Sequence, residues 1–268
     1  MITTKKKFTL SKSQLAKKFR VENNNLDITA LIKSSGYDVK KIGEIAPAHR
    51  NERDINNTKD KLIKYVQISD IDVNLGRIKA YRRFKGSDAP NNARRLMKYG
   101  DVLVSTRRPT RGAVIAVPKE FDQEICSIFF TSLSILNWDE ADPWYLALFL
   151  RTSLGRFQFK SMITETAYPV ISDDDVENMI VLLPPIDVQR NLAKGYDDSV
   201  QNFFAKLNEA YASITSARQR IEDLILQDEA EAIETPKFGL EIEEIIEDND
   251  QNTEQQTETQ LILQEPVS

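Results

Sequence analysis

The apolar residues in the last third of the chain are spaced by three, four or seven positions, which places them on one face of an α-helix. Pro184 and Pro185 lack backbone N–H groups, so this helix must begin after them. We predict one long coiled-coil-type helix over residues 186–232, whose apolar stripe requires a partner helix. The stripe consists of Leu192, Tyr196, Val200, Phe203, Leu207, Tyr211, Ile214, Ile221 and Ile225.

Residues 37–185 carry a different pattern, in which short apolar runs are interrupted by Gly, Pro and Asn. The spacing predicts a helix from Pro143 to Thr152 that continues toward Phe159, and Ser172 with Asp175 predicts a capping box. Short, irregularly broken strands favour an α+β domain with a small, strongly bent sheet over a parallel doubly wound one. The predicted strands are 64–68, 78–81, 102–105, 113–117, 132–136 and 179–182.

The two ends of the chain differ from this middle part in composition and charge. Residues 1–36 are predicted to form a basic, mostly mobile arm, and residues 233–268 an acidic disordered tail. Residues 228–268 contain 13 acidic residues and one lysine, a charge of −12, so with a net charge of −5 the remainder carries −5 + 12 = +7. Between Arg50 and Arg111, 16 Lys and Arg residues face 7 Asp and Glu, an excess of +9. A basic surface of this kind is typical of binding to nucleic-acid phosphates.

Three groups of residues are candidates for contacts with DNA. One is a strand whose alternation would place Arg77, Lys79, Tyr81 and Arg83 on one face. A second is a loop after a strand, where the planar fork of arginine could read guanine. A third, weaker group contains asparagines that could read adenine or only shape a turn. The candidates are Arg77, Lys79, Tyr81, Arg82, Arg83 and Lys85; Arg107, Arg108, Thr110 and Arg111; and Asn91, Asn92, Arg94 and Arg95.

The sequence offers little for catalysis. Cys126 and His49 are the only residues of their kinds, which excludes a disulfide framework, a Cys/His zinc site and a histidine-activated nucleophile. Asp142-Pro143-Trp144-Tyr145 superficially resembles a methyltransferase loop, but no glycine-rich turn follows a strand to hold a methyl donor, so it is interpreted as a helix start. We expect no metal site and no cofactor in this chain. No apolar run reaches about 18 residues and no export signal precedes the body, so a cytoplasmic location is expected.

Several blocks along the chain together resemble the specificity subunit of type I restriction-modification systems. Their order and spacing over about 190 residues carry the resemblance, because each block alone is weak. Ile163 to Tyr168 depart from the family pattern, since such subunits usually carry a glycine-containing turn there. The blocks are Tyr37 to Ala46, Tyr65 to Ile71 with Gly76 to Ile78, Tyr99 to Ser105, Asp142 to Leu146, Leu154-Gly155, Ile171-Ser172, and the Pro-Pro-x-x-x-Gln that ends at Gln189.

The resemblance implies one target-recognition domain followed by one spacer helix. Such a chain would bind double-stranded DNA without chemistry of its own. It would present the DNA to an adenine methyltransferase subunit and, in some systems, to a restriction and translocase subunit, so that S-adenosylmethionine, ATP and Mg²⁺ would belong to the partners. The stripe would pair with a second copy or with another half-specificity subunit. Two alternatives remain: a detached recognition module of a methyltransferase-nuclease enzyme, and a DNA-binding coiled-coil adaptor without sequence choice.

Overall fold

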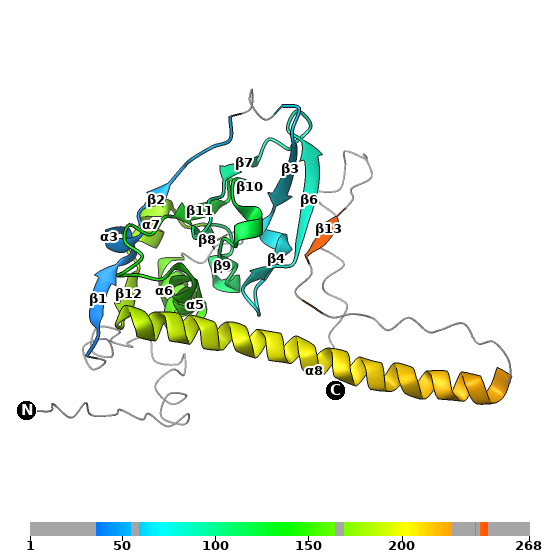
Figure 1. The fold of residues 1–268 in the computed structure, drawn as a ribbon. Helices are drawn as coiled ribbons and strands as arrows, with labels where there is room; N and C mark the ends of the chain where they lie inside the picture. Colours follow the sequence, from blue (N-terminus) through cyan, green and yellow to red (C-terminus); the bar gives the residue numbers. More distant parts are fainter. Residues whose placement is uncertain (1–35, 55–58, 164–168, 227–238, 240–241, 246–268) are drawn as a thin grey trace, which may run out of the picture.

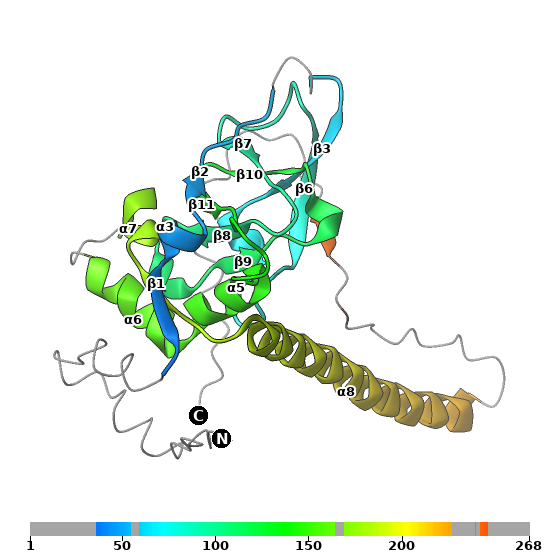
Figure 2. The ribbon, with the colours of Figure 1, turned by 60° about the vertical axis from the view of Figure 1, so that its left-hand side comes forward.

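The structure, a computed structural model, describes residues 36–54, 59–163, 169–226, 239 and 242–245. These residues form a compact body from which one long helix, α8 (Ile186–Leu226), projects (Figure 1). The view in Figure 2 shows α8 leaving the body beside α5 (Pro143–Arg151), with most of its length clear of the other helices and strands. None of the helices in the described ranges is long and apolar enough to span a membrane.

The body contains two main sheets instead of the single bent sheet that the sequence predicts. The four-stranded sheet has the order β2 (Ala48–His49), β11 (Phe130–Leu133), β8 (Val102–Ser105) and β9 (Val114–Ala116). The five-stranded sheet has the order β13 (Glu243–Ile245), β6 (Ala80–Lys85), β3 (Leu62–Val66), β10 (Ile125–Ser127) and β7 (Ala93–Leu96). Two smaller pairs are β1 (Asp38–Lys41) with β12 (Ile180–Leu183), and β4 (Ile71–Asp72) with β5 (Arg77–Ile78). The α+β class is confirmed.

Strand β8 lies at the centre of the hydrophobic core. Leu103 packs in a cluster with residues of β3 and β10 from the five-stranded sheet, whereas Val102 and Val104 pack in a second cluster with α5 and α6 (Ser153–Met162). Because side chains alternate along a strand, a strand covered on both faces needs apolar residues on both, and Val102, Leu103 and Val104 supply them. All four residues of β8, including Ser105, are buried. The body is therefore layered as sheet, sheet and helices.

Two helices of the body, α5 and α7, begin where the sequence predicts caps. The Asp142 carboxylate accepts a hydrogen bond of 2.8 Å from the Tyr145 N–H at the start of α5. Ser172 and Asp175 form the predicted capping box at the start of α7 (Asp173–Glu177). The predicted helix is interrupted at Thr152, where a Cβ on Gly155 would lie 2.2 Å from the Leu150 carbonyl oxygen. Only glycine lets α6 follow α5 this closely.

The Pro-Pro-x-x-x-Gln block fixes the base of α8. The Gln189 side chain is fully buried, and its amide nitrogen donates to the carbonyl oxygens of Glu140 (2.9 Å) and Pro184 (2.8 Å). Its amide oxygen accepts from the Asp142 N–H at 3.0 Å, so one side chain ties α8 to the start of α5. α8 contains 41 residues and is about 60 Å long.

The element boundaries differ from the predictions in several places. The strand predicted at 132–136 lies at Phe130–Leu133, and β7 and β10 were not predicted. The predicted strand 78–81 is divided into β5 and β6. Residues 227–232 of the predicted helix and nearly all of the predicted arm (1–36) lie outside the described residues. The prediction of a disordered tail is wrong for Glu243–Ile245, which form a strand; most of the remaining tail is not among the described residues.

Candidate nucleic-acid interface

The loop between β8 and β9 presents a rigidly held group of arginines. Ser105 Oγ donates to the Arg107 carbonyl oxygen at 2.7 Å, and Thr106 Oγ1 donates to the Phe129 carbonyl oxygen at 2.8 Å. The exposed Arg107 guanidinium lies 3.6 Å from the centroid of the Phe129 ring. This stacking orients a planar group with five N–H donors at the surface before any ligand arrives.

Arg108 adopts a backbone conformation that few side chains tolerate. Its φ of 48° is in the left-handed region, which costs a non-glycine residue about 1 kcal/mol or more. The Arg108 N–H donates to the Pro169 carbonyl oxygen at 2.9 Å, and Arg107 forms a β-bridge with Val170. These contacts hold the strained turn in place. Backbone strain that is held in place by surrounding contacts is typical of functional loops.

A fourth arginine joins this loop from a distant part of the sequence. Arg156, exposed on α6, donates to the Arg111 carbonyl oxygen at 3.3 Å. Arg111 and Thr110 belong to the short 3₁₀ helix η2 (Pro109–Arg111), and both are exposed. The sequence shows Arg156 only as a polar position on an amphipathic helix, so no local signal identifies it. We name Arg107, Arg108, Arg111 and Arg156 the arginine loop cluster.

The asparagine group lies beside the arginine loop cluster. The Ile128 N–H donates to the Asn92 carbonyl oxygen at 3.0 Å, while the adjacent Phe129 carbonyl accepts from Thr106. The turn between β10 and β11 is thus hydrogen-bonded to both groups, and Asn91 and Arg94 are exposed. The structure places these predicted residues together.

Arg95, by contrast, is an internal residue. Only 6% of Arg95 is exposed, and its guanidinium donates to the His49 carbonyl oxygen at 3.1 Å. A side chain committed to the interior cannot reach DNA. The prediction that Arg95 contacts DNA is therefore withdrawn.

The predicted basic strand is divided between two sheets. β5 pairs with β4 and β6 pairs with β3, and the chain leaves strand geometry between them at Lys79, whose N–H donates to the Asp70 carbonyl oxygen at 2.8 Å. Burial nevertheless alternates across this break, since Ile78 and Ala80 are buried while Arg77, Lys79, Tyr81 and Arg83 are at least partly exposed. Lys79 and Lys85 are exposed, but Arg77 lies apart, at the joint with α8.

Arg82 is the second correction. Its Nη1 lies 2.9 Å from both carboxylate oxygens of Asp70, a residue that is 2% exposed. Burial raises the pKa of the Asp70 carboxyl, while the Gln67 N–H and the Arg82 guanidinium act in the opposite direction. Arg82 therefore compensates a buried charge within the body and leaves the set of DNA candidates.

Arg82→Met should lower the free energy of unfolding at neutral pH by about 2 to 3 kcal/mol, because it leaves the Asp70 carboxylate buried without its partner. Since burial raises the folded pKa of Asp70, the deficit should shrink as the pH falls through that pKa, where a protonated carboxyl needs no counter-charge. Urea unfolding at neutral and acidic pH measures both effects. Lys79→Met, at an exposed lysine, is the control, and equal stability of the two variants would contradict the assignment.

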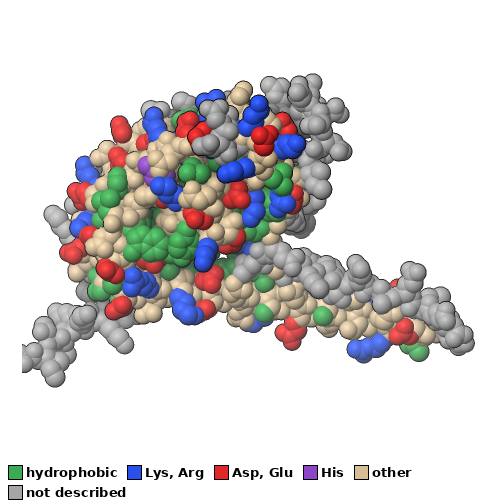
Figure 3. All heavy atoms as spheres, turned by 45° about the horizontal axis from the view of Figure 1, so that its top comes forward, with side chains coloured by type: hydrophobic (Ala, Val, Ile, Leu, Met, Phe, Trp, Pro, Cys, Tyr) green, Lys and Arg blue, Asp and Glu red, His purple; other side chains and the backbone are tan. Residues whose placement is uncertain are grey.

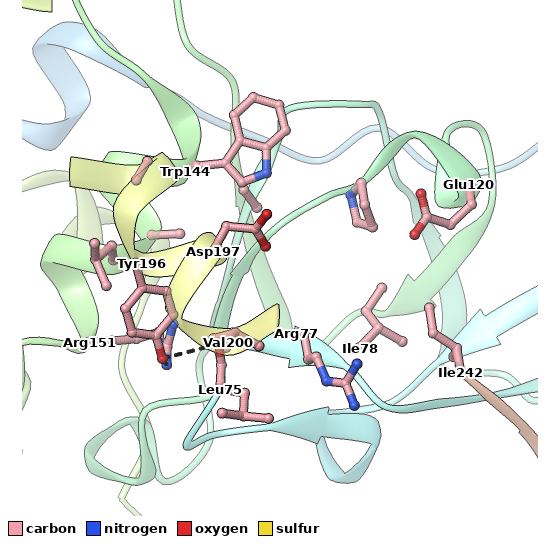
Figure 4. Close-up of a pocket in the computed structure, with 16 residues that line it drawn as sticks. Leu75, Arg77, Ile78, Glu120, Trp144, Arg151, Tyr196, Asp197, Val200 and Ile242 are labelled. Atoms are coloured by element: carbon pink, nitrogen blue, oxygen red, sulfur yellow. Dashed lines mark hydrogen bonds between the residues drawn. The ribbon is translucent and has the colours of Figure 1, made fainter. Parts of the chain in front are cut away.

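Arg77 belongs to the joint between the body and α8. Its guanidinium lies 4.6 Å from the centroid of the Phe204 ring on α8 and donates to the Gly239 carbonyl oxygen at 2.9 Å. It lines a pocket together with Arg151, Tyr196 and Val200 (Figure 4). The pocket encloses about 220 Å³, less than the roughly 300 Å³ at which small-molecule sites begin. We therefore interpret it as part of the joint.

An exposed aromatic cluster that the sequence did not reveal lies at the base of α8. The ring centroids of Tyr99, Trp138 and Trp144 lie 5.5 to 5.9 Å apart, and Tyr99 and Trp138 are 43% and 39% exposed. A Cβ on Gly100 would lie 2.3 Å from Trp138, and Arg190 of α8 donates to the Trp138 carbonyl oxygen. Figure 3 shows hydrophobic side chains gathered on the body beside the long helix. Exposed aromatic groups of this size are enriched at protein interfaces.

The His49, Ser134 and Cys126 side chains do not form a nucleophile–base pair. His49 Nε2 lies 3.0 Å from an Asp101 carboxylate oxygen, and Ser134 donates to the other oxygen of Asp101, so this serine is not activated by the histidine. Burial raises the pKa of the Cys126 thiol, and that side chain is inaccessible. Within the described ranges, no group of three or more His, Cys, Asp or Glu side chains is placed to hold a metal ion.

Residues 34–213 match the family model of the type I restriction modification DNA specificity domain. The crystal structure of the HsdS subunit from Thermoanaerobacter tengcongensis is similar, with a TM-score of 0.57 and 27% identity over 70% of this chain and 48% of that chain. A chain from a structure on complex assembly and conformational transition of the type I R-M system has a TM-score of 0.57 and 26% identity, over 75% and 52% of the two chains. The chain spans about half the length of these solved relatives. None of the curated proteins compared with it is a significant match.

Proposed function

Because the chain belongs to the type I restriction modification DNA specificity domain family, we propose that it is a subunit that selects the DNA sequence on which a type I complex acts. The arginine loop cluster carries the proposal at residue level. Three of its arginines are exposed, one of them stacked on an aromatic ring, and all four surround a loop fixed on both sides. Pre-oriented arginines at the end of a rigid strand suit contacts with phosphates and with guanine edges.

We further propose that the chain performs no chemistry itself and acts in the cytoplasm. An adenine methyltransferase subunit, and in restricting systems a translocase subunit, would supply S-adenosylmethionine, ATP and Mg²⁺. The exposed aromatic cluster and the free length of α8 are surfaces on which such partners could dock. The similarity to a chain from a structure on complex assembly of the type I R-M system supports, by analogy, the proposal that this chain works with partner subunits.

Selection from a pool of random duplexes tests sequence choice. We expect the purified chain to enrich a bipartite sequence with a constant gap, because two recognition units held by paired helices would read two separated half-sites. Recovery of an unchanged pool despite tight binding would instead favour the adaptor without sequence choice.

Incubation of the chain alone with S-adenosylmethionine and the selected duplex tests the enzyme alternative. We expect no methyl transfer until a methyltransferase subunit is added, since the sequence contains no glycine-rich turn to hold the methyl donor. Methylation by the chain alone would establish the recognition module of a methyltransferase enzyme.

A further inference from the structure

The last described segment of the chain completes the five-stranded sheet. β13 pairs in parallel with β6, with Glu243 opposite Ala80, Glu244 opposite Tyr81 and Ile245 opposite Arg82. Without this segment, β6 would be an edge strand with one row of unpaired N–H and C=O groups, which readily accepts another extended strand. The segment and β6 lie side by side in Figure 1.

The segment also engages the basic residues of that edge. A Glu244 carboxylate oxygen accepts a hydrogen bond of 3.1 Å from the Tyr81 hydroxyl and lies 3.4 Å from Arg83 Nη2. The Arg83 guanidinium in turn donates to the Tyr81 hydroxyl at 3.1 Å. Arg77 binds the Gly239 carbonyl oxygen, and Ile242 packs against the core cluster between the two sheets. Three residues predicted to contact DNA are therefore occupied by this segment.

The length of the chain allows the segment to come from the same molecule. Val200 and Ile242 line the same pocket, so the chain leaves the body near Val200 and returns there. From Val200 to Leu226 the helix extends about 39 Å. The 16 residues from Leu226 to Ile242 span at most about 55 Å when extended, which is enough to return. A tether of this length keeps the segment at a high local concentration near β6.

We propose that the edge of β6 is a docking surface for this acidic segment and that the segment competes there with DNA. The proposal rests on the proposed function, since it takes Tyr81 and Arg83 as phosphate contacts. From Gly239 to the C-terminus the sequence has nine acidic and no basic residues. When the segment is docked, the Glu244 carboxylate takes the place of a phosphate oxygen at Tyr81 and Arg83. DNA must displace the segment, so the apparent affinity for DNA equals the intrinsic affinity multiplied by the fraction of molecules in which the segment is undocked.

A disulfide between β6 and β13 tests the competition within one protein. Tyr81 and Glu244 are partners in the parallel register, and neighbouring strands lie about 4.8 Å apart, which suits a disulfide. In the Tyr81→Cys, Glu244→Cys variant of the full chain, we expect an intrachain disulfide to form under mild oxidation. Cys126 is fully buried and should not exchange with it. The oxidised form should bind a fluorescent random-sequence duplex about tenfold more weakly than the reduced form of the same variant.

A matched pair of single substitutions tests the side-chain contact. Glu244→Gln and Glu247→Gln remove the same charge three residues apart, and the Glu244 carboxylate is the one in contact with Tyr81 and Arg83 in the described segment. Competition predicts a severalfold higher affinity for the duplex in Glu244→Gln and a smaller change in Glu247→Gln. Equal changes would show that only net charge matters and would overturn the proposal.

Two further outcomes would also contradict the proposal. Equal affinities of the oxidised and reduced forms would show that the β6 edge lies away from DNA. A disulfide that forms only between chains would assign the segment to a second copy. If the unmodified chain and both forms of the variant fail to bind duplex at low salt, the proposed function itself fails.

Discussion

Replacing Arg107, Arg108 and Arg111 together by alanine should weaken DNA binding by about two to three orders of magnitude at about 0.1 M salt. Each arginine that neutralises a phosphate contributes about 0.9 to the slope of log affinity against log salt. Three lost contacts should therefore flatten the slope by about 2.7, which corresponds to a factor of roughly 500 at that salt concentration. Fluorescence anisotropy of a labelled duplex over a range of salt concentrations measures both quantities.

The control removes the same three charges elsewhere. Lys206, Arg218 and Arg220 are exposed on α8, the helix that projects from the body, and their replacement by alanine should leave most of the affinity. Single substitutions then separate the roles, because a base-reading arginine should relax preference at one position of the selected sequence. If both triple variants lose the same affinity and slope, the loop has no special role and only net charge attracts DNA.

How far the sequence predicts this structure depends on how local each signal is. β8 was predicted at its observed bounds because a strand buried on both faces is a continuous apolar run. α8 was predicted from its stripe and from the two prolines before it, and the caps at Asp142 and Ser172 depend on neighbouring residues alone. β7 and β10 contain Arg95 and Cys126 in a pairing between distant segments, which no local pattern reveals.

The residues predicted to contact DNA also divide into those with a local sequence signal and those that only the fold identifies. The arginine loop was found because its basic residues are adjacent in sequence, whereas Arg156 reaches it only through the packing of α6. Arg82, Arg95 and Arg107 all lie in the same basic stretch of the sequence. Only the partners of the first two, the Asp70 carboxylate and the His49 carbonyl oxygen, identify them as internal. A charge pattern predicts that a surface is basic, but the fold decides which cations reach it.

The stripe on α8 is likewise divided by the fold. Val200 is buried against the body, and the Tyr196 hydroxyl bonds to the Asn74 carbonyl oxygen and to Arg151. Beyond Val200 the Arg77 guanidinium still lies over the Phe204 ring, but Leu207 is only half-buried and other stripe residues are more than one-third exposed. These are Phe203, Tyr211, Ile214, Ile221 and Ile225, to which the structure adds Leu224. The tertiary contacts thus divide the predicted stripe into two parts. Tyr196 and Val200 belong to the joint with the body, and the exposed apolar residues beyond them form a seam for a partner helix.

Replacing Leu207 and Ile214 by aspartate should convert a paired form of the chain into monomers. A two-fold symmetric pair would bring four carboxylates into one apolar seam, where each buried charge without a partner costs several kcal/mol, so the dissociation constant should rise at least about 1,000-fold. The apolar side chains that α8 exposes beyond Val200 support pairing of two units. Light scattering gives the mass, and the monomers should keep only weak half-site binding.

Ala205 and Ala212 provide the matched control for this prediction. They are exposed, seven residues apart like Leu207 and Ile214, and displaced from them by two residues, about 200° around the helix. Aspartates there add the same charge on the opposite face and should leave the pair intact. A monomer for the unmodified chain at micromolar concentration would rule out the homodimer. The exposed seam would then require a different half-specificity subunit, and the target would be two unlike half-sites instead of an inverted repeat.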